Sequence, residues 1–196
     1  MIPFPSGTRV WLATGALRPI NAMAKTAGRI AEGSVQPGDA VRVLPSGVRT
    51  RVKAVLSGFD EVPAAHTLSS ITLTLEDEVD ASRGDVIVSD EALPDVADQF
   101  EARLLWMSER PLSPGRAYLV KHASKELTAS VTKISHREDV NTGERIPAET
   151  AHLNEVVAIH LQTSAPLVFE PYRTNKVLGS FILIDKLTFE TVGAGM

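Results

Sequence analysis

The chain has 196 residues, of which 43% are hydrophobic and 22% charged, and its formal net charge is −4. These values are normal for a folded protein of one large or two small domains, and the negative charge argues against binding nucleic acid by general phosphate attraction. The chain contains no cysteine, which excludes disulfides, iron–sulfur clusters and thiol catalysis. The apolar runs are too short to span a bilayer, so we expect a cytoplasmic protein with no membrane contact.

The first part of the chain predicts a series of short strands separated by turns. Strands are expected over residues 8–14, 27–35, 40–44, 49–56, 71–76 and 86–88, whereas residues 16–24 are expected to be irregular. Apolar residues stand at every second position at Ile71, Leu73 and Leu75, which is the period of a strand with one buried face. Residues 36–39 and 45–47 combine proline with glycine, as turns do. Short strands spaced about ten residues apart by such turns indicate a small β-barrel.

The second part follows an acidic stretch, residues 91–99, that lacks strand alternation and that we interpret as a linker. Strands are then expected over residues 100–107, 116–121, 126–134, 155–161, 180–185 and 191–196. The alternation of Leu127, Ala129 and Val131 is broken at Ile134, which predicts a bulge near Lys133.

These patterns together predict an all-β fold with two consecutive small β-barrels. The expected division has an atypical N-terminal segment with the first strand (residues 1–26), a first barrel (27–90), a linker (91–99) and a second barrel (100–196).

Several stretches resemble a known family in their order and spacing. GRIAEGSVQPGDAVRVLPSG (residues 28–47) and TLTLEDEVDASRGDVI (72–87) resemble the second domain of the GTPase subunit of bacterial sulfate adenylyltransferase, or ATP sulfurylase. Residues 98–121, 139–144, 153–156 and 179–196 resemble its third domain. The resemblance implies two barrels of the kind that follow the G domain in translational GTPases such as elongation factor Tu, where they are domains II and III.

The same resemblance implies a role in sulfate assimilation and cysteine biosynthesis. In this family a catalytic subunit joins ATP and sulfate to give adenosine phosphosulfate, and GTP hydrolysis by the partner subunit helps to drive the reaction. The expected partner of this chain is therefore that catalytic subunit. Loss of contact with a G domain would also expose barrel surface, so we expect self-association.

The motifs of a GTPase do not occur in these residues. No segment fits G-x-x-x-x-G-K-[S/T], the loop that cradles phosphates and magnesium, and Asn175-Lys176 is followed by Val177-Leu178 rather than by the aspartate of a guanine reader. We expect no cofactor in this chain, because GTP and magnesium bind the G domain in the family. The chain alone is predicted to be an inactive interaction module, a truncated form of the GTPase subunit.

Residues 1–15, MIPFPSGTRVWLATG, resemble instead the start of an accessory protein encoded in bacterial insertion sequences. A mobile element that interrupted or abutted a sulfurylase gene would explain this beginning. Two alternatives to the interaction module therefore stay open: a non-functional gene remnant, and a nucleic-acid-binding barrel pair of the translation-factor type. The negative net charge counts against the second.

Two acidic patterns in the first barrel invite a functional interpretation. The carboxylates Glu76, Asp77, Glu78 and Asp80 suggest a calcium site, but the glycine of an EF-hand loop is missing and a solvated turn is favoured. Residues 83–85 spell the adhesion tripeptide Arg-Gly-Asp, for which a turn with positive φ at Gly84 is the simpler explanation.

Other candidate residues also have plain structural explanations. Trp11 and Trp106 are candidates for stacking on a nucleic-acid base, but Trp106 is in phase with Leu104 and is predicted to pack in the core. Gly193, Ala194 and Gly195 are expected to let the last strand close the barrel, since no helix follows them to form a phosphate site.

The histidines and the basic residues of the second barrel carry weaker signals still. The histidines are His66, His122, His136, His152 and His160, and their spacing predicts surface or barrel-wall positions rather than a zinc site.

The basic residues Arg116, Lys121, Lys125, Lys133, His136 and Arg137 suggest a patch for an acidic partner or nucleic acid, but a solvated barrel face is favoured. No catalytic, cofactor-binding or metal-binding residue is assigned.

Overall fold

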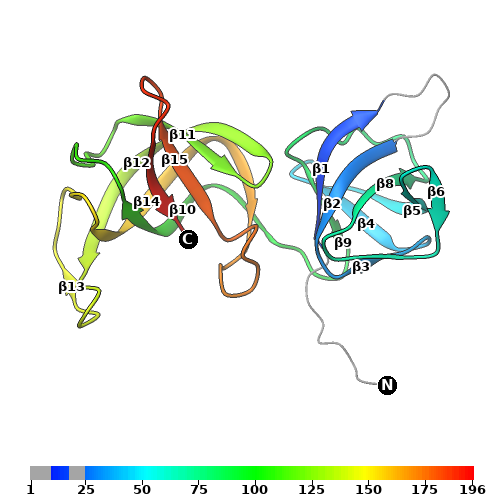
Figure 1. Ribbon diagram of the computed structural model, residues 1–196, viewed down its shortest axis with the longest axis horizontal. Coiled ribbons are helices and arrows are strands. Elements are labelled where there is room, and N and C mark those ends of the chain that lie inside the picture. The colour runs from blue at the N-terminus through cyan, green and yellow to red at the C-terminus, as the bar shows by residue number, and fades with distance from the viewer. Residues whose placement is uncertain (1–9, 18–24) are drawn as a thin grey trace. The chain divides into compact units, whose positions relative to one another are not determined.

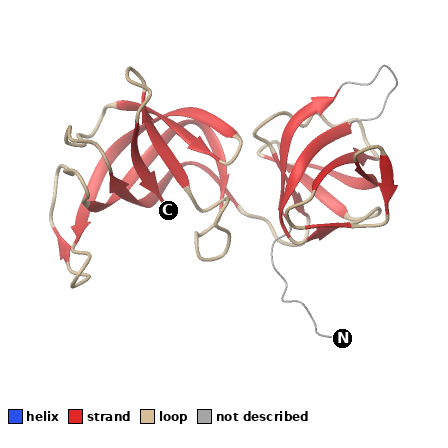
Figure 2. Cartoon of the chain, viewed as in Figure 1, coloured by secondary structure: helices blue, strands red, loops and turns tan. Residues whose placement is uncertain are grey.

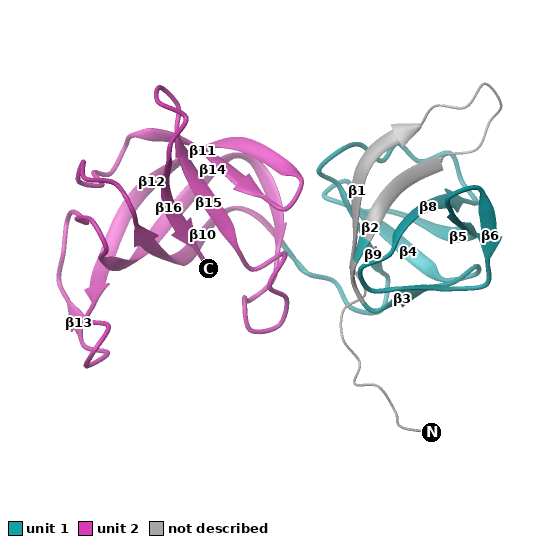
Figure 3. Ribbon diagram, viewed as in Figure 1, with its two compact units in different colours: residues 1–95 teal, residues 96–196 magenta. Residues whose placement is uncertain are grey.

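The computed structural model describes residues 10–17 and 25–196, and all of its regular elements in this part of the chain are β-strands (Figures 1 and 2). The predicted all-β class is confirmed. None of the described residues forms a helix long and apolar enough to cross a membrane. The chain divides into two compact units, residues 1–95 and residues 96–196 (Figure 3).

The described residues of unit 1 form nine strands, of which all but β3 and β7 belong to one antiparallel sheet. The strands are β1 (Val10–Leu17), β2 (Lys25–Glu32), β3 (Ser34–Val35), β4 (Ala40–Leu44), β5 (Val48–Ser57), β6 (Asp60–Val62), β7 (Ala65–His66), β8 (Ser70–Leu75) and β9 (Val86–Ser89). The sheet order is β4-β9-β1-β2-β8-β5-β6, and β4 also pairs with β5. The extra pairing closes β4, β9, β1, β2, β8 and β5 into a barrel.

Unit 2 forms a second closed barrel with a different strand order. Its strands are β10 (Asp95–Trp106), β11 (Ala117–His122), β12 (Lys125–Glu138), β13 (Arg145–Ile146), β14 (Val156–Phe169), β15 (Phe181–Asp185) and β16 (Thr191–Gly195). The sheet order is β11-β15-β16-β10-β14-β12-β13, and pairing of β11 with β12 closes the ring. The prediction of two consecutive small barrels is therefore confirmed.

Part of the segment expected to be a linker, residues 91–99, lies in a strand. Residues 95–99, which carry no apolar alternation, form the first half of β10 and only residues 91–94 lie outside a strand. This half of β10 is mostly exposed to solvent. An exposed strand needs no apolar residue at every second position, so the sequence gives no sign of it. Strand β1 likewise runs to Leu17, into the stretch expected to be irregular, and residues 1–9 lie outside the described part.

Several local predictions are confirmed. The register between β12 and β14 shifts between Val131 and Lys133 and again between Ile134 and His136, which places the expected bulge at Lys133. Ile71, Leu73 and Leu75 of β8 are buried, although Thr74, expected on the wet face, is buried as well.

Glycines in β16 allow the second barrel to close tightly. Strand β16 lies between β10 and β15, with Gly195 opposite both Leu104 and Phe181. A Cβ at Gly195 would overlap the Phe181 ring, and one at Gly193 would lie 3.0 Å from Leu104 Cδ1. The prediction that small residues let the last strand close the barrel is therefore confirmed, and Phe181 occupies the space that a side chain at residue 195 would need.

Candidate functional site

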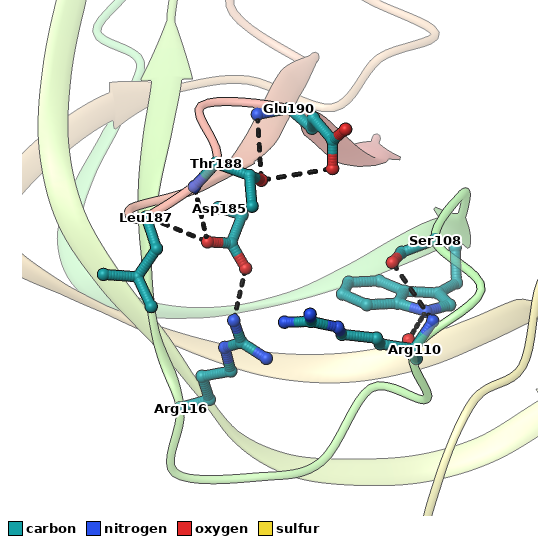
Figure 4. Close-up of polar contacts among 8 residues, drawn as sticks. Ser108, Arg110, Arg116, Asp185, Leu187, Thr188 and Glu190 are labelled. Atoms are coloured by element: carbon teal, nitrogen blue, oxygen red, sulfur yellow. Dashed lines mark hydrogen bonds and ion pairs between the residues drawn. The ribbon is translucent and has the colours of Figure 1, made fainter.

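Asp185 is the centre of a polar cluster at one end of the second barrel (Figure 4). It is the last residue of β15 and is buried, and its Oδ1 accepts hydrogen bonds from the backbone N–H groups of Leu187 at 2.8 Å and Thr188 at 3.2 Å. Its Oδ2 accepts a hydrogen bond from the Arg116 guanidinium. One carboxylate thus fixes both the turn after β15 and a cation from the neighbouring chain segment.

The surroundings hold the pKa of Asp185 below its ordinary value. The largest cause is the hydrogen bond from the Leu187 N–H, and the Thr188 N–H and the positive charges of Arg116 and Arg110 act in the same direction against partial desolvation. The carboxylate is therefore charged at neutral pH, as an ion pair with Arg116 requires.

Arg116 is held from a second side by an aromatic ring. Its guanidinium carbon lies 5.7 Å from the centroid of the Tyr118 ring, within the range of a cation–π interaction. Tyr118 of β11 stands opposite Asp185 of β15 in the strand register and packs edge-on against Trp106 at 5.8 Å between ring centroids. Burial raises the pKa of the Tyr118 hydroxyl, with the charge of Arg116 opposing the shift.

Arg110 brings a second cation to the cluster. The Trp106 Nε1–H donates a hydrogen bond to the Arg110 carbonyl oxygen at 2.8 Å, so the buried indole fixes the backbone of the exposed residue. Figure 4 shows the Arg110 guanidinium directed toward that of Arg116, and among the described residues it has no hydrogen-bond or ion-pair partner. The cluster therefore contains two guanidiniums around one carboxylate, an arrangement suited to binding an acidic group.

The acidic residues of unit 1 lie at the solvent-exposed end of β8. Glu76, Asp77, Glu78 and Asp80 are all exposed, and Asp77 Oδ2 accepts a hydrogen bond from Thr50 Oγ1 at 2.9 Å. Nowhere in the described chain do three or more histidine, aspartate or glutamate side chains gather in a group that could hold a metal ion.

The Arg-Gly-Asp segment is a turn, as expected. Gly84 has a φ of 98°, which glycine adopts without strain, and Asp85 Oδ2 accepts a hydrogen bond from the Ser82 N–H at 2.8 Å. The prediction of a positive φ at Gly84 is confirmed.

The histidines lie apart from one another and have separate surroundings. His66 and His152 are exposed, His160 Nε2 lies 3.1 Å from Glu101 Oε1, and His136 Nε2 lies 3.6 Å from Glu138 Oε1. His152 precedes β14 whereas His160 lies within it, so no single strand runs through both. His122 is buried, and its Nε2 lies 2.9 Å from the Leu178 carbonyl oxygen; burial lowers its pKa.

The basic residues of unit 2 do not form one free patch. Arg116 pairs with Asp185, Arg137 pairs with Glu155 at 2.5 Å, and Lys125 Nζ donates a hydrogen bond to the Pro166 carbonyl oxygen at 3.1 Å. Lys121 stands opposite Glu126 in the strand register. Neighbouring carboxylates thus neutralise much of the charge that phosphate binding would require.

The remaining sequence candidates have structural roles. Trp106 is buried, which confirms its predicted place in the core, and the side chain of Trp11 lies outside the described part. Asn175 is buried, and its Oδ1 accepts hydrogen bonds from the Val177 and Leu178 N–H groups, which shapes the loop between β14 and β15.

Sequence reading did not single out Asp185 or Arg110. An aspartate at the end of a strand is a recognisable signal for a side chain that caps its own turn. The signal for Arg110 is weaker, since only the fold brings the loop after β10 close to the end of β15.

The comparisons with known proteins place this chain among translation-factor-like barrels. Residues 99–196 match the family model described as GTP-eEF1A C-terminal domain-like. The chain belongs to that family. It is also homologous to the C-terminal barrel domains of sulfate adenylyltransferase subunit 1, which confirms the resemblance found in the sequence.

Two curated relatives define the range of the sequence match. The chain is 48% identical over 170 residues to sulfate adenylyltransferase subunit 1 of Laribacter hongkongensis, a match covering 86% of this chain and 35% of the relative. It is 48% identical over 178 residues to the bifunctional enzyme CysN/CysC of Xylella fastidiosa, covering 91% of this chain and 29% of the relative. The chain thus spans only about a third of the length of these relatives.

Solved structures share the fold at low sequence identity. The structure of sup35 complexed with GDP has a TM-score of 0.83 and 20% identity, covering 96% of this chain and 46% of that chain. The translation elongation factor SelB of Methanococcus maripaludis has a TM-score of 0.77 and 18% identity, covering 97% of this chain and 42% of that chain. At these identities the likeness concerns the fold alone.

Proposed function

We propose that the two barrels are a docking module of the sulfate adenylyltransferase subunit 1 type, which binds the catalytic subunit that forms adenosine phosphosulfate from ATP and sulfate. The observation that carries the proposal is the 48% identity to such a subunit over 170 residues, which extends across both barrels. On this proposal the chain works in the cytoplasm in sulfate assimilation.

The site in unit 2 supports binding rather than catalysis as the task of the chain. Asp185, Arg116 and Arg110 form a cation-rich cluster fixed by buried aromatic residues, and such a cluster recognises carboxylates by charge-assisted hydrogen bonds. These residues bind no nucleotide on this proposal, and GTP with magnesium belongs to the G domain that the family carries ahead of its barrels.

A binding measurement tests the proposal. Titration calorimetry of the chain against the catalytic subunit from the same organism should give a saturable heat, whereas titration with GTP and magnesium should give none. Absence of binding to the catalytic subunit would favour a gene remnant, and micromolar GTP binding would show that the nucleotide site has been missed.

The alternative of a nucleic-acid-binding barrel pair rests on the shared fold. The pairing of Arg116 with Asp185 and of Arg137 with Glu155 counts against it, because those cations are already engaged. A salt-dependent mobility shift with RNA would revive the alternative.

A further inference from the structure

The loop that joins β15 to β16, residues 186–190, presents two large apolar side chains to solvent. Leu187 is 81% exposed and Phe189 is 73% exposed, two residues apart in the same short loop. Single exposed apolar residues are common on protein surfaces, but a pair presented so fully in one loop is typical of a contact surface. We call residues 186–190 the tip loop.

Phe189 has a left-handed backbone conformation, which is unfavourable for an aromatic residue. Its φ of 58° lies in the left-handed region, which glycine and asparagine enter readily and an aromatic residue does not. The Phe189 side chain contributes little to the core because it is mostly exposed. A strained backbone that supports an exposed aromatic ring suggests a role in contact with a partner.

Hydrogen bonds hold the tip loop in one shape. The Phe189 N–H donates to the Asp185 carbonyl oxygen at 2.9 Å, and the Asp185 N–H donates to the Glu190 carbonyl oxygen at 2.9 Å. Asp185 Oδ1 binds the Leu187 and Thr188 N–H groups, as described above. A surface ordered before binding loses less conformational entropy when the partner arrives.

The cations of the Asp185 cluster lie at the base of the same loop. Arg116 is bonded to Asp185 and its side chain is 36% exposed, while the Arg110 guanidinium is unpaired among the described residues (Figure 4). Arginine and large aromatic residues contribute most of the binding energy at many protein interfaces. The surface thus combines an apolar projection with a guanidinium that makes no hydrogen bond or ion pair among the described residues.

We infer that Leu187, Phe189 and Arg110 form the surface by which unit 2 docks on the catalytic subunit, with the two apolar side chains entering an apolar socket that has carboxylates at its rim. This inference rests on the proposed function. The partner's carboxylates would bind the Arg110 guanidinium. The chain as a whole is acidic, at net charge −4, so the local cations determine where an acidic rim makes contact.

Two substitutions test the tip loop without unfolding the barrel. Phe189→Asn removes the ring and places at residue 189 a side chain that tolerates a left-handed backbone, so the variant should be at least as heat-stable as the wild type. Leu187→Ser removes the second apolar side chain from an exposed position. Unit 1 offers a matched control in Phe59→Ser, since Phe59 is a fully exposed aromatic residue in the turn between β5 and β6.

The measurement is the affinity of the full chain for the purified catalytic subunit of the same organism, by titration calorimetry. We expect the Phe189→Asn/Leu187→Ser double variant to raise Kd by about 30-fold or more, as the loss of an interface hot spot does. Arg110→Ala should raise Kd by about 10-fold and weaken its salt dependence, whereas Phe59→Ser should leave Kd within about 2-fold of the wild type.

The possible outcomes separate the two proposals. Wild-type binding that the double variant leaves unchanged would overturn the tip-loop assignment and leave the docking function intact. Absence of wild-type binding would overturn both. If light scattering shows wild-type self-association that the double variant abolishes, while the catalytic subunit still binds, a second copy of the chain covers the tip loop and the assignment is wrong.

Discussion

The described core of unit 1 is filled by aliphatic side chains such as Ile30, Val43 and Leu75, whereas the core of unit 2 also contains the rings of Trp106, Tyr118 and Phe181. Both units bury threonine side chains, but the larger buried polar side chains of the described residues, His122, Glu170, Asn175 and Asp185, all belong to unit 2. The comparison suggests that the first barrel is held mainly by apolar packing, while the second uses aromatic rings and buried polar groups to fix its loops.

The strand orders of the two barrels differ in a related way. In unit 1 the first strand, β1, lies between the next strand, β2, and the last strand, β9, whereas in unit 2 the first strand, β10, lies between β14 and the last strand, β16. In both barrels the last strand thus pairs with the first. The last strand of unit 2 must therefore fit against the first, and its glycines leave room for Leu104 and Phe181. The large side chains Leu104 and Phe181 thus fit in the core of unit 2 only because β16 has glycine at residues 193 and 195.

The largest effect is expected from Trp106→Ala. The substitution removes a buried indole and its hydrogen bond to the Arg110 carbonyl oxygen, so we expect a loss of about 3–5 kcal/mol in unfolding free energy. Hydrogen exchange followed by peptide mass spectrometry should show faster exchange in residues 96–196 than in residues 1–95. Ile87→Val, a conservative core change in unit 1, should cost only about 0.5–1.5 kcal/mol. Equal acceleration in both units by Trp106→Ala would show that the two cores are not independent.

A smaller loss is expected when a methyl group is added to β16. Gly195→Ala places a Cβ against the Phe181 ring, and such overpacking costs about 1–3 kcal/mol. Gly193→Ala should cost less, because the nearest atom is the end of the Leu104 side chain, 3.0 Å away. Urea denaturation of both variants gives the order, and equal stability of Gly195→Ala and the wild type would contradict the closure argument.

The sequence predicted the strands that bury one face and therefore carry an apolar residue at every second position. It missed strands that lack this alternation. Ile71, Leu73 and Leu75 predicted β8, and the broken alternation around Lys133 predicted a bulge that the register confirms. Strands β7 and β13 contain two residues each and are too short to show a period, whereas the equally short β3 lies within the strand expected over residues 27–35.

The site was harder to predict than the fold, for a physical reason. Asp185, Arg110 and Arg116 come from the end of one strand and from a loop far away in sequence, and only barrel closure brings them together. The exposure of Phe189 and its left-handed backbone also depend on tertiary structure, because the sequence of residues 186–190 contains no glycine or proline to indicate a tight turn.

A pH-dependent effect is expected from His122 of unit 2. Burial lowers the pKa of this imidazole in the folded chain, so the unfolded chain takes up a proton first as the pH falls. Its contribution to stability is therefore present above the ordinary histidine pKa of about 6.5 and is lost as the pH falls through the lower folded value. His122→Gln should flatten the fall in melting temperature below this pH. Exposed His66 of unit 1 supplies the control, His66→Gln, and an unchanged profile in His122→Gln would contradict the prediction.

The smallest effect is expected from Asp185→Asn, and it should shrink in strongly acidic solution. The folded pKa of Asp185 is lowered, first by the Leu187 N–H, so its contribution to stability is present above the ordinary aspartate pKa of about 3.9 and is lost as the pH falls through the folded value. Asparagine keeps an oxygen for the Leu187 and Thr188 N–H groups but loses the charge that pairs with Arg116. The variant should therefore be less stable than the wild type at pH 7 and lose less stability on acidification, as measured by melting temperature from pH 7 to pH 2.5.

Asp139 and Glu155, whose pKa values are also lowered, lie in unit 2 as well, so hydrogen exchange in acid should increase first in residues 96–196. If hydrogen exchange in acid increased first in residues 25–95, the carboxylates with lowered pKa values in unit 2 would not determine which barrel unfolds first in acid.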